Sequence, residues 1–177
     1  MKRRTTKISM LMSIVILLSF LMTVPVFAET AKSVKKVSPT FTKSVAEKNA
    51  YKVTKGTVRL KISQGGYIKF TAPKAGKYNF TFSGLSSGSG YASFMKSDSA
   101  KTIAYVGNSK VVTKGGKSST LWICSKSFAS FYKNQALRVR PIPTRTGTIS
   151  LKKGECVYMY ISTGSTSKVT LKIAQKK

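Results

Sequence analysis

Apolar and polar residues alternate in short runs over most of the chain from Gly56 onward. The first three runs are "TVRLKI" (57–62), "YIKFTA" (67–72) and "KYNFTF" (77–82), each with apolar residues at every second position. Side chains of a β-strand point alternately to its two faces. A period of two therefore predicts strands that face a core on one side and solvent on the other.

A similar set of three alternating runs recurs near the C-terminus. "GTVRLKISQGGYIKFTAPKAGKYNFTF" (56–82) aligns without a gap on "GTISLKKGECVYMYISTGSTSKVTLKI" (147–173), at a constant offset of 91. The apolar phase agrees, with Ile68 opposite Met159 in the alignment and Phe80 opposite Leu171. We interpret the repeat as two similar three-stranded units in one sandwich, each supplying a face of the core.

The residues between the two repeats predict further strands and one helix. Strands are expected at "YASFMKS" (91–97), "TIAYVG" (102–107), "SKVVTKGGKSSTLWICS" (109–125) and "ALRVRP" (136–141), after a flexible loop at "SGLSSGSG" (83–90). In "SKSFASFYKN" (125–134) the residues Phe128, Phe131 and Tyr132 recur at helical spacing behind Ser125, which predicts a short helix. The fold class is therefore all-β, an antiparallel β-sandwich or jelly-roll-like domain over residues 56–177, with seven to nine short strands and at most one short helix.

The first 28 residues have the pattern of a secretory signal peptide. A basic start is followed by an almost wholly apolar run from Ile8 to Met22, and "VFA" (26–28) predicts cleavage after Ala28. An uncleaved membrane helix is the alternative, because the apolar run approaches the length of a spanning segment. Residues 29–55 have weak periodicity and many lysines, and they predict a basic tether or a lead-in strand. We expect a bacterial protein that is secreted, extracellular or associated with the cell surface.

The charge balance points to a partner. The chain has 32 Lys and Arg against four Asp and Glu, and a formal net charge of +28. A few net charges suffice for solubility, so the excess favours a partner of opposite charge over solvation alone. Most of the cations are lysines, which suit diffuse attraction better than bidentate recognition of single phosphates. For an exported bacterial protein, such partners are teichoic acids, acidic polysaccharides, anionic phospholipid surfaces and extracellular DNA.

The strand phase places many of these cations on outward faces. We expect a basic sheet face that binds polyanions, made of Arg59, Lys61, Lys69, Lys77, Arg138, Arg140, Lys152, Lys168 and Lys172. The alternative is that each of these side chains is only solvated.

A second outward set is aromatic. Tyr67, Trp122, Tyr158 and Tyr160 share the outward phase, and they are a candidate platform for stacking on sugar rings. Outward aromatic residues also stabilise sheets through cross-strand pairing, which is the alternative explanation for their presence.

Two cysteines remain for the mature chain. Cys124 and Cys156 each lie on an expected strand, in the phase of outward-facing neighbours. Outside the cytoplasm an even pair can form a disulfide, which would stabilise by about 3–4 kcal/mol in the chain-entropy model. Two free thiols are an equally weighted alternative.

The residue types present exclude most catalytic chemistry. The chain has no histidine, which removes the usual general base, the Ser–His and Cys–His pairs and imidazole metal ligands. Four acids far apart in sequence do not predict paired carboxylates, and two cysteines do not supply a four-thiolate zinc site. We expect a non-enzyme with no catalytic residues, no metal and no cofactor.

Two motifs, "GGYIKFTAPKAGKYNFTFSG" (65–84) and "LKKGECVYMYISTGSTSKVTLKI" (151–173), resemble bacterial pre-peptidase C-terminal-type domains. The resemblance covers residues 56–84 and 147–174. It implies a secreted β-sandwich, similar in outline to the collagen-binding domains of clostridial collagenases. Some family members bind calcium through aspartates after the first hairpin. Here Asp98 is the only acid in that region, so no calcium site is expected. Members are usually appended to a catalytic domain, whereas here the sandwich is expected to be the whole mature chain.

Together these features predict a secreted, non-catalytic binding module for an anionic cell-envelope or extracellular polymer, such as teichoic acid or an acidic polysaccharide. A carbohydrate-binding module that uses exposed aromatic residues is the alternative. A cationic antibacterial or membrane-active factor ranks third, because no strong amphipathic helix is evident; peripheral contact with a membrane is compatible with the charge. We do not expect specific nucleic-acid recognition, because no recognition helix or single-strand motif is visible, and we expect a monomer.

Overall fold

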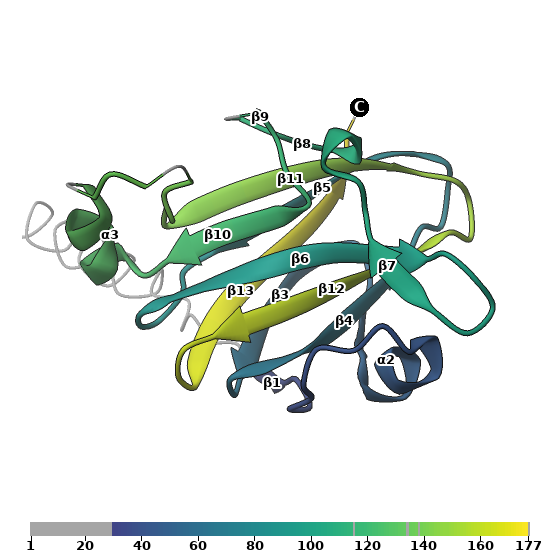
Figure 1. Cartoon of the computed structure of the whole chain (residues 1–177), viewed down its shortest axis with the longest axis horizontal. Coiled ribbons are helices and arrows are strands. Elements are labelled where there is room, and N and C mark those ends of the chain that lie inside the picture. Colours follow the sequence, from purple (N-terminus) through teal and green to yellow (C-terminus); the bar gives the residue numbers. More distant parts are fainter. Residues whose placement is uncertain (1–29, 115, 134, 138, 177) are drawn as a thin grey trace, which may run out of the picture.

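The computed structural model describes residues 30–176 apart from Gly115, Asn134 and Arg138. The expected signal peptide, residues 1–28, lies outside the described residues. None of the helices within the described part of the chain is long and apolar enough to cross a membrane. Figure 1 shows two β-sheets packed on each other, with one α-helix at the lower right and another at the left-hand end.

The larger sheet has seven strands in the order β1-β3-β13-β5-β11-β8-β9. Their bounds are β1 (Lys32–Ser33), β3 (Gly56–Ile62), β13 (Ser167–Gln175), β5 (Gly76–Ser83), β11 (Thr144–Leu151), β8 (Val111–Thr113) and β9 (Gly116–Lys117). Every neighbouring pair in this sheet is antiparallel except β1 with β3, which is parallel.

The smaller sheet has the order β10-β6-β12-β4-β2, and β7 pairs with β6 beside this path. The bounds are β10 (Thr120–Cys124), β6 (Ser89–Ser97), β12 (Cys156–Thr163), β4 (Gly65–Thr71), β2 (Tyr51–Val53) and β7 (Ile103–Tyr105). The predicted β-sandwich is thus confirmed. The described residues form thirteen strands where seven to nine were expected, because strands of two or three residues, such as β1, β2 and β9, are too short to give an alternating pattern.

Within the described residues, two α-helices and one 3-10 helix accompany the strands: α2 (Lys43–Asn49), α3 (Lys126–Lys133) and η1 (Asn108–Lys110). The predicted helix is α3, and Ser125 Oγ accepts a hydrogen bond from the Phe128 backbone N–H at 3.3 Å. Helix α2 was not expected. The strand predicted at 136–141 is wrong, because its described residues pair with no sheet and expose Leu137 and Val139 by 46% and 42%.

The two repeats interlock. In each, the first and third strands join the larger sheet and the middle strand joins the smaller one. The equivalent residues Ile68 and Met159 pair directly across β4 and β12, and the equivalent Thr81 and Lys172 pair directly across β5 and β13. An approximate two-fold axis therefore passes through both pairs. The expectation that each repeat supplies one face of the core is wrong, because alternation identifies the buried side of a strand but not the sheet that the strand joins.

The inner faces of the two sheets meet in one apolar core. Phe80 lies at its centre, edge-on to Phe70 and to Phe94, with ring centroids 5.4 Å apart in each pair. Such edge-to-face pairs are the favoured arrangement of aromatic rings. The core positions read from the first hairpin are all fully buried, namely Ile68, Phe70, Tyr78, Phe80 and Phe82.

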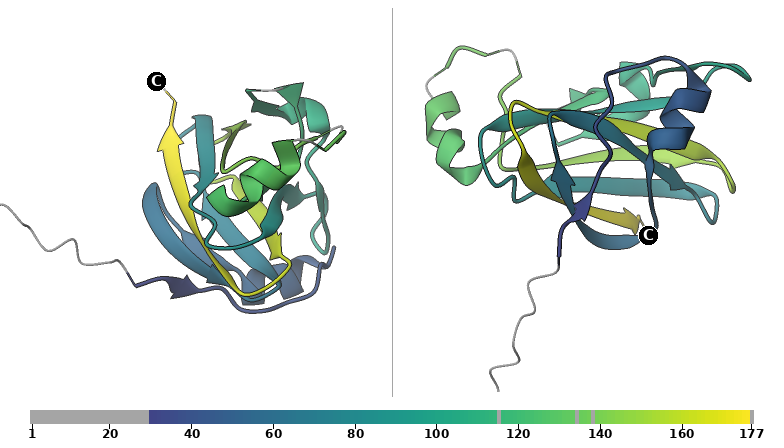
Figure 2. Two further views of the ribbon diagram at one scale, coloured as in Figure 1. Left: turned by 90° about the vertical axis from the view of Figure 1, so that its left-hand side faces the viewer. Right: turned by 90° about the horizontal axis from the view of Figure 1, so that it is seen from below.

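Residues 30–55 cover part of the outer face of the smaller sheet. Helix α2 packs beside β4, and the right-hand view of Figure 2 shows this dark segment crossing in front of the strands. Ala46 of α2 is fully buried in a second apolar cluster, outside the sandwich core. The Tyr67 hydroxyl donates to Thr40 O and accepts from the Thr40 backbone N–H, both at 2.8 Å. The part of this segment between β1, which joins the larger sheet, and β2, which joins the smaller one, therefore forms a partial third layer on the smaller sheet.

Candidate functional site

The outer face of the larger sheet carries exposed cations among hydroxyl and amide side chains. We call it the basic face. Its outward-facing cations are Arg59, Lys61, Lys77, Lys168 and Lys172, and between them lie Thr57, Asn79, Thr81, Thr146, Thr148, Ser150 and Thr170. Several of the polar side chains bond to one another, as Thr81 Oγ1 does to Thr146 Oγ1 at 2.8 Å.

Two lysines of the basic face lie directly opposite each other. Lys61 on β3 pairs with Lys168 on β13, and both side chains are exposed. Beside them, Arg59 Nη1 donates to Thr170 Oγ1 at 2.7 Å and to Gly84 O at 2.9 Å, which holds the guanidinium at the sheet surface. Like charges directly opposite in an antiparallel pair destabilise it.

The three acidic residues that the structure describes all lie away from the basic face. Glu47 on α2 accepts from Lys69 Nζ at 3.1 Å, and Glu155, in the turn before β12, accepts from Lys96 Nζ at 2.6 Å. Asp98, in the turn after β6, accepts from Thr102 Oγ1 at 2.6 Å. In the described ranges, no three His, Cys, Asp or Glu side chains gather where one metal ion could be held.

Five of the nine cations expected on one face do share the basic face. Lys152 lies in the turn after β11. Lys69 belongs to the other sheet, where its ammonium lies 5.5 Å from the centre of the Tyr158 ring. Arg140 lies in the segment between α3 and β11, and Arg138 is outside the described residues. Outward phase alone does not distinguish the outer faces of the two sheets, so Lys69 was grouped with residues on the opposite side.

The expected aromatic platform is wrong for three of its four members. Tyr67, Tyr158 and Tyr160 point away from the sandwich core, as their phase predicts, but they are 0%, 0% and 5% exposed. Residues 30–55 cover them, and the weak periodicity of that segment gave no sign of this packing. Trp122 does remain exposed, at 40%.

Glu47 joins α2 to the covered tyrosines. The Tyr158 hydroxyl donates to Glu47 Oε1 at 2.5 Å, and this bond, together with that from Lys69, lowers the pKa of Glu47. Burial and the neighbouring carboxylate raise the pKa of the Tyr158 phenol, and burial raises the pKa of Tyr160 to about 12. These tyrosines are therefore neutral at physiological pH, and Tyr158 helps to fasten the covering segment.

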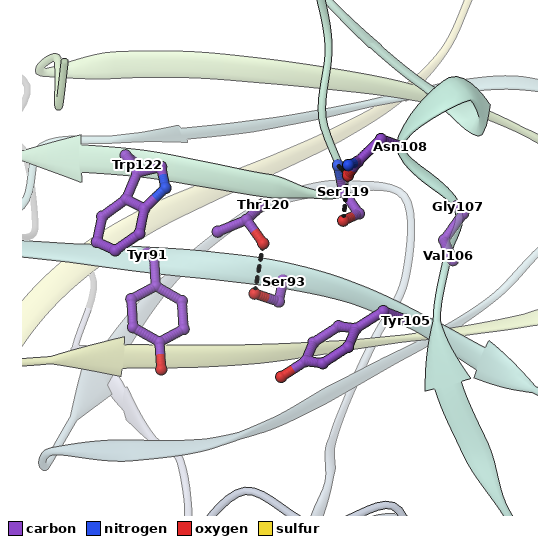
Figure 3. A pocket seen from close by; sticks show the side chains of 9 residues that line it. All are labelled: Tyr91, Ser93, Tyr105, Val106, Gly107, Asn108, Ser119, Thr120 and Trp122. Atoms are coloured by element: carbon purple, nitrogen blue, oxygen red, sulfur yellow. Dashed lines mark hydrogen bonds between the residues drawn. The ribbon is translucent and has the colours of Figure 1, made fainter. Parts of the chain in front are cut away.

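A shallow pocket of about 540 Å³ lies on the uncovered part of the smaller sheet. Figure 3 shows Trp122 of β10 beside Tyr91 of β6 at one end and Tyr105 of β7 at the other. Trp122 and Tyr91 are cross-strand neighbours, with ring centroids 5.1 Å apart and planes inclined by 51°. The sequence pattern put Trp122 in the outward phase of its strand and gave no phase for Tyr91. The pattern did not predict that the two side chains are neighbours, because β6 and β10 are not consecutive strands.

Uncharged polar groups complete this pocket. Ser93 Oγ and Thr120 Oγ1 lie 2.9 Å apart between the aromatic rings. Asn108 Oδ1 accepts from the backbone N–H of Ser119 at 3.0 Å and from its hydroxyl at 2.8 Å. The remaining lining residues are Val106 and Gly107, so none of the nine lining residues is charged.

The two cysteines are free thiols, and the disulfide alternative is wrong. Cys124 pairs with Ser89 at one end of β6. Cys156 lies two residues before Tyr158, which pairs with Met95 near the other end of β6. Cys156 is thus level with Ser97, eight residues from Ser89, which at the usual rise per residue is roughly 26 Å along the strand, whereas a disulfide needs Cα atoms within about 7 Å.

Comparison with known proteins finds similarity to solved structures. No family model matches the chain, and no curated protein matches it. Among solved structures, the crystal structure of the pre-peptidase C-terminal domain of a collagenase from Bacillus anthracis is similar, with a TM-score of 0.40 and 10% sequence identity. The match covers 71% of this chain and 94% of that domain. It is a member of the family that the two hairpin motifs resemble.

Proposed function

We propose that the chain is a non-catalytic binding module that attaches to an anionic polymer through the basic face. The observation that carries the proposal is the direct pairing of Lys61 with Lys168, on a face where the described residues include no acid. Such a pair weakens the sheet in isolation. A bound polyanion converts the same concentration of positive charge into attraction.

The arrangement of the cations suits an extended polymer. Outward residues two apart on a strand are about 7 Å apart, and neighbouring strands are about 4.8 Å apart. Arg59 and Lys61 on β3, with Lys168 and Lys172 on β13, therefore form two adjacent rows of charge. The threonine hydroxyls between them can donate to phosphate or carboxylate oxygens.

Teichoic acid and acidic polysaccharide are the ligand classes that this surface favours. Lysine ammonium groups are mobile point charges, and they match a chain of repeated anionic groups better than one specific phosphate. Binding of this kind weakens as salt screens the charges.

The test is retention of the purified protein on Gram-positive cell walls, before and after chemical removal of teichoic acid. We expect retention at about 0.1 M NaCl and release at about 1 M, where the screening length falls from about 10 Å to about 3 Å. Equal retention on stripped walls would contradict the teichoic-acid assignment, and retention at high salt would contradict the polyanion mechanism.

Matched variants locate the binding surface. The double variant Lys61→Ser/Lys168→Ser removes two charges from the basic face. The control Lys48→Ser/Lys101→Ser removes two exposed charges from α2 and from the turn before β7. We expect the first variant to elute at clearly lower salt than the control. Equal losses in both variants would mean that only net charge matters.

A further inference from the structure

The pocket beside Trp122 is neutral on a strongly basic protein. None of its nine lining residues is charged, although the chain has a formal net charge of +28. A site for an anionic group would be expected to gather lysine or arginine. The ligand of this pocket therefore differs in chemistry from that of the basic face.

Its aromatic rings are exposed and yet held in place. Trp122 is 40% and Tyr105 is 50% exposed. Tyr91 packs against Trp122 at 5.1 Å, and Phe41 packs edge-on against Tyr105 at 5.6 Å between ring centroids. The rings thus present apolar surface to solvent in fixed positions, which lowers the entropy cost of binding a ligand.

The polar groups between the rings are hydroxyls and an amide. Ser93, which is 3% exposed, shares a hydrogen bond with Thr120 on the pocket floor. Because Asn108 Oδ1 is engaged by Ser119, the amide nitrogen is the group of this exposed side chain that can donate to a ligand. These groups match ligand hydroxyls and supply no charge for a phosphate or carboxylate.

We propose that this pocket binds a pyranose ring of an uncharged glycan. A pyranose has a face of C–H groups that can lie on an aromatic ring, and hydroxyls at its edge that pair with side-chain hydroxyls and amides. The pocket volume of about 540 Å³ is within the usual range of small-ligand sites. The site uses Tyr91 and Tyr105 with Trp122, lies on the opposite sheet from the basic face, and is independent of it.

Trp122 provides a direct readout, because it is the chain's one tryptophan. The purified protein is titrated with cello-, chito-, malto- and xylo-oligosaccharides while the tryptophan fluorescence is followed. We expect at least one series to change the emission saturably, with an affinity that is the same at about 0.1 M and about 1 M NaCl. The absence of any change in tryptophan emission with all four series, up to an oligosaccharide concentration of about 10 mM, would overturn the proposal. Such a concentration would occupy even a weak site.

Variants assign the signal to the pocket. Tyr105→Ala keeps the reporter, and we expect it to weaken binding by about tenfold or more, as for a central aromatic contact. Asn108→Ala should weaken it as well, with thermal unfolding measured to verify that both variants fold. Trp122→Ala should show no binding when it is titrated with the oligosaccharide by calorimetry, which is needed because this variant lacks the fluorescent residue. Unchanged affinity in Tyr105→Ala and Trp122→Ala would overturn the assignment of binding to this pocket.

The basic-face variant separates the two proposals. Lys61→Ser/Lys168→Ser should bind the oligosaccharide as tightly as the unmodified protein. Loss of oligosaccharide binding in that variant, or on addition of salt, would assign the ligand to the basic face and refute the pocket.

Discussion

The hydroxyl of Tyr158 on β12 donates a hydrogen bond to the carboxylate of Glu47 on α2, a residue 111 positions away in the chain. Lys69 of the neighbouring strand donates to the same oxygen at 3.1 Å. Together with the paired hydrogen bonds between Tyr67 and Thr40, this contact fixes residues 30–55 on the smaller sheet. The same covering leaves the Trp122 end of that sheet open.

Glu47→Gln should loosen this attachment. The substitution keeps the side-chain shape but removes the charge that both donors bind. Because the Glu47 side chain is 40% exposed, the expected loss is modest, about 1 kcal/mol in the free energy of unfolding. Chemical denaturation measures it, and an unchanged midpoint would contradict the role assigned to this carboxylate.

The same residue predicts a pH dependence. Its pKa is lower in the folded protein than in the unfolded chain, so its stabilisation is present above about pH 4.3 and is lost as pH falls through the folded pKa. Thermal unfolding between about pH 3 and pH 7 should therefore fall less steeply for Glu47→Gln than for the unmodified protein. Parallel profiles would contradict the expectation.

Gly66→Ala should displace the start of the segment 30–55, where Val34 packs into the sandwich core. A Cβ at Gly66 would lie 2.5 Å from Lys35 O and 2.7 Å from Val34 Cγ1, so residues 34 and 35 must move. We expect a loss of about 1–3 kcal/mol in the free energy of unfolding. Gly164→Ala is the control, because a Cβ there meets nothing within 4 Å. Equal stability of the two variants would mean that residues 34 and 35 do not pack on β4.

The two thiols should differ in reactivity. Cys124 is fully buried, and burial raises its pKa, whereas Cys156 is half-buried in a turn-proximal position. A thiol reagent should label Cys156 first in the native protein and both cysteines after unfolding. Labelling only after reduction, detected by mass, would contradict the free-thiol structure.

Lys168→Thr should make the protein more stable and a poorer polyanion binder. Removing the charge opposite Lys61 relieves a like-charge pair, which is expected to add about 0.2–1 kcal/mol to the free energy of unfolding at low salt. The gain should shrink as salt rises. Lys101→Thr, in an exposed turn, is the control. A lower melting temperature for Lys168→Thr would contradict the repulsion.

The inward half of the fold was predictable and the outward half only partly so. Burial forces a period of two, which identified Ile68 and Phe80 as core. The same period does not show which sheet a strand joins. Lys61 and Lys69 therefore had the same outward phase in the sequence, although they lie on opposite sheets. Whether an outward residue is covered depends on other segments. For Tyr67 that segment is 30–55, whose short elements have almost no pattern.

The pocket could not be predicted from the sequence for a related reason. Tyr91, Tyr105 and Trp122 come from three strands, and their meeting depends on the pairing of β6 with both β7 and β10. Pairing between strands that are not consecutive leaves no local signal in the sequence. Outward phase therefore identified Trp122 as a candidate without revealing its neighbours.

The interlocked repeats give the chain a particular assembly problem. β5 of the first repeat lies between β11 and β13 of the second, and β4 lies beside β12, so neither repeat completes a sheet with its own strands. A nascent chain that ends before residue 144 holds its longest strands without these neighbours, and such long-range pairing is slow to form. In architecture the molecule is two half-domains joined as if they were partners in a dimer. One repeat supplied twice would be expected to pair its strands about a true two-fold axis, but it would lack the core residues that β6 and β10 add, such as Phe94 and Leu121.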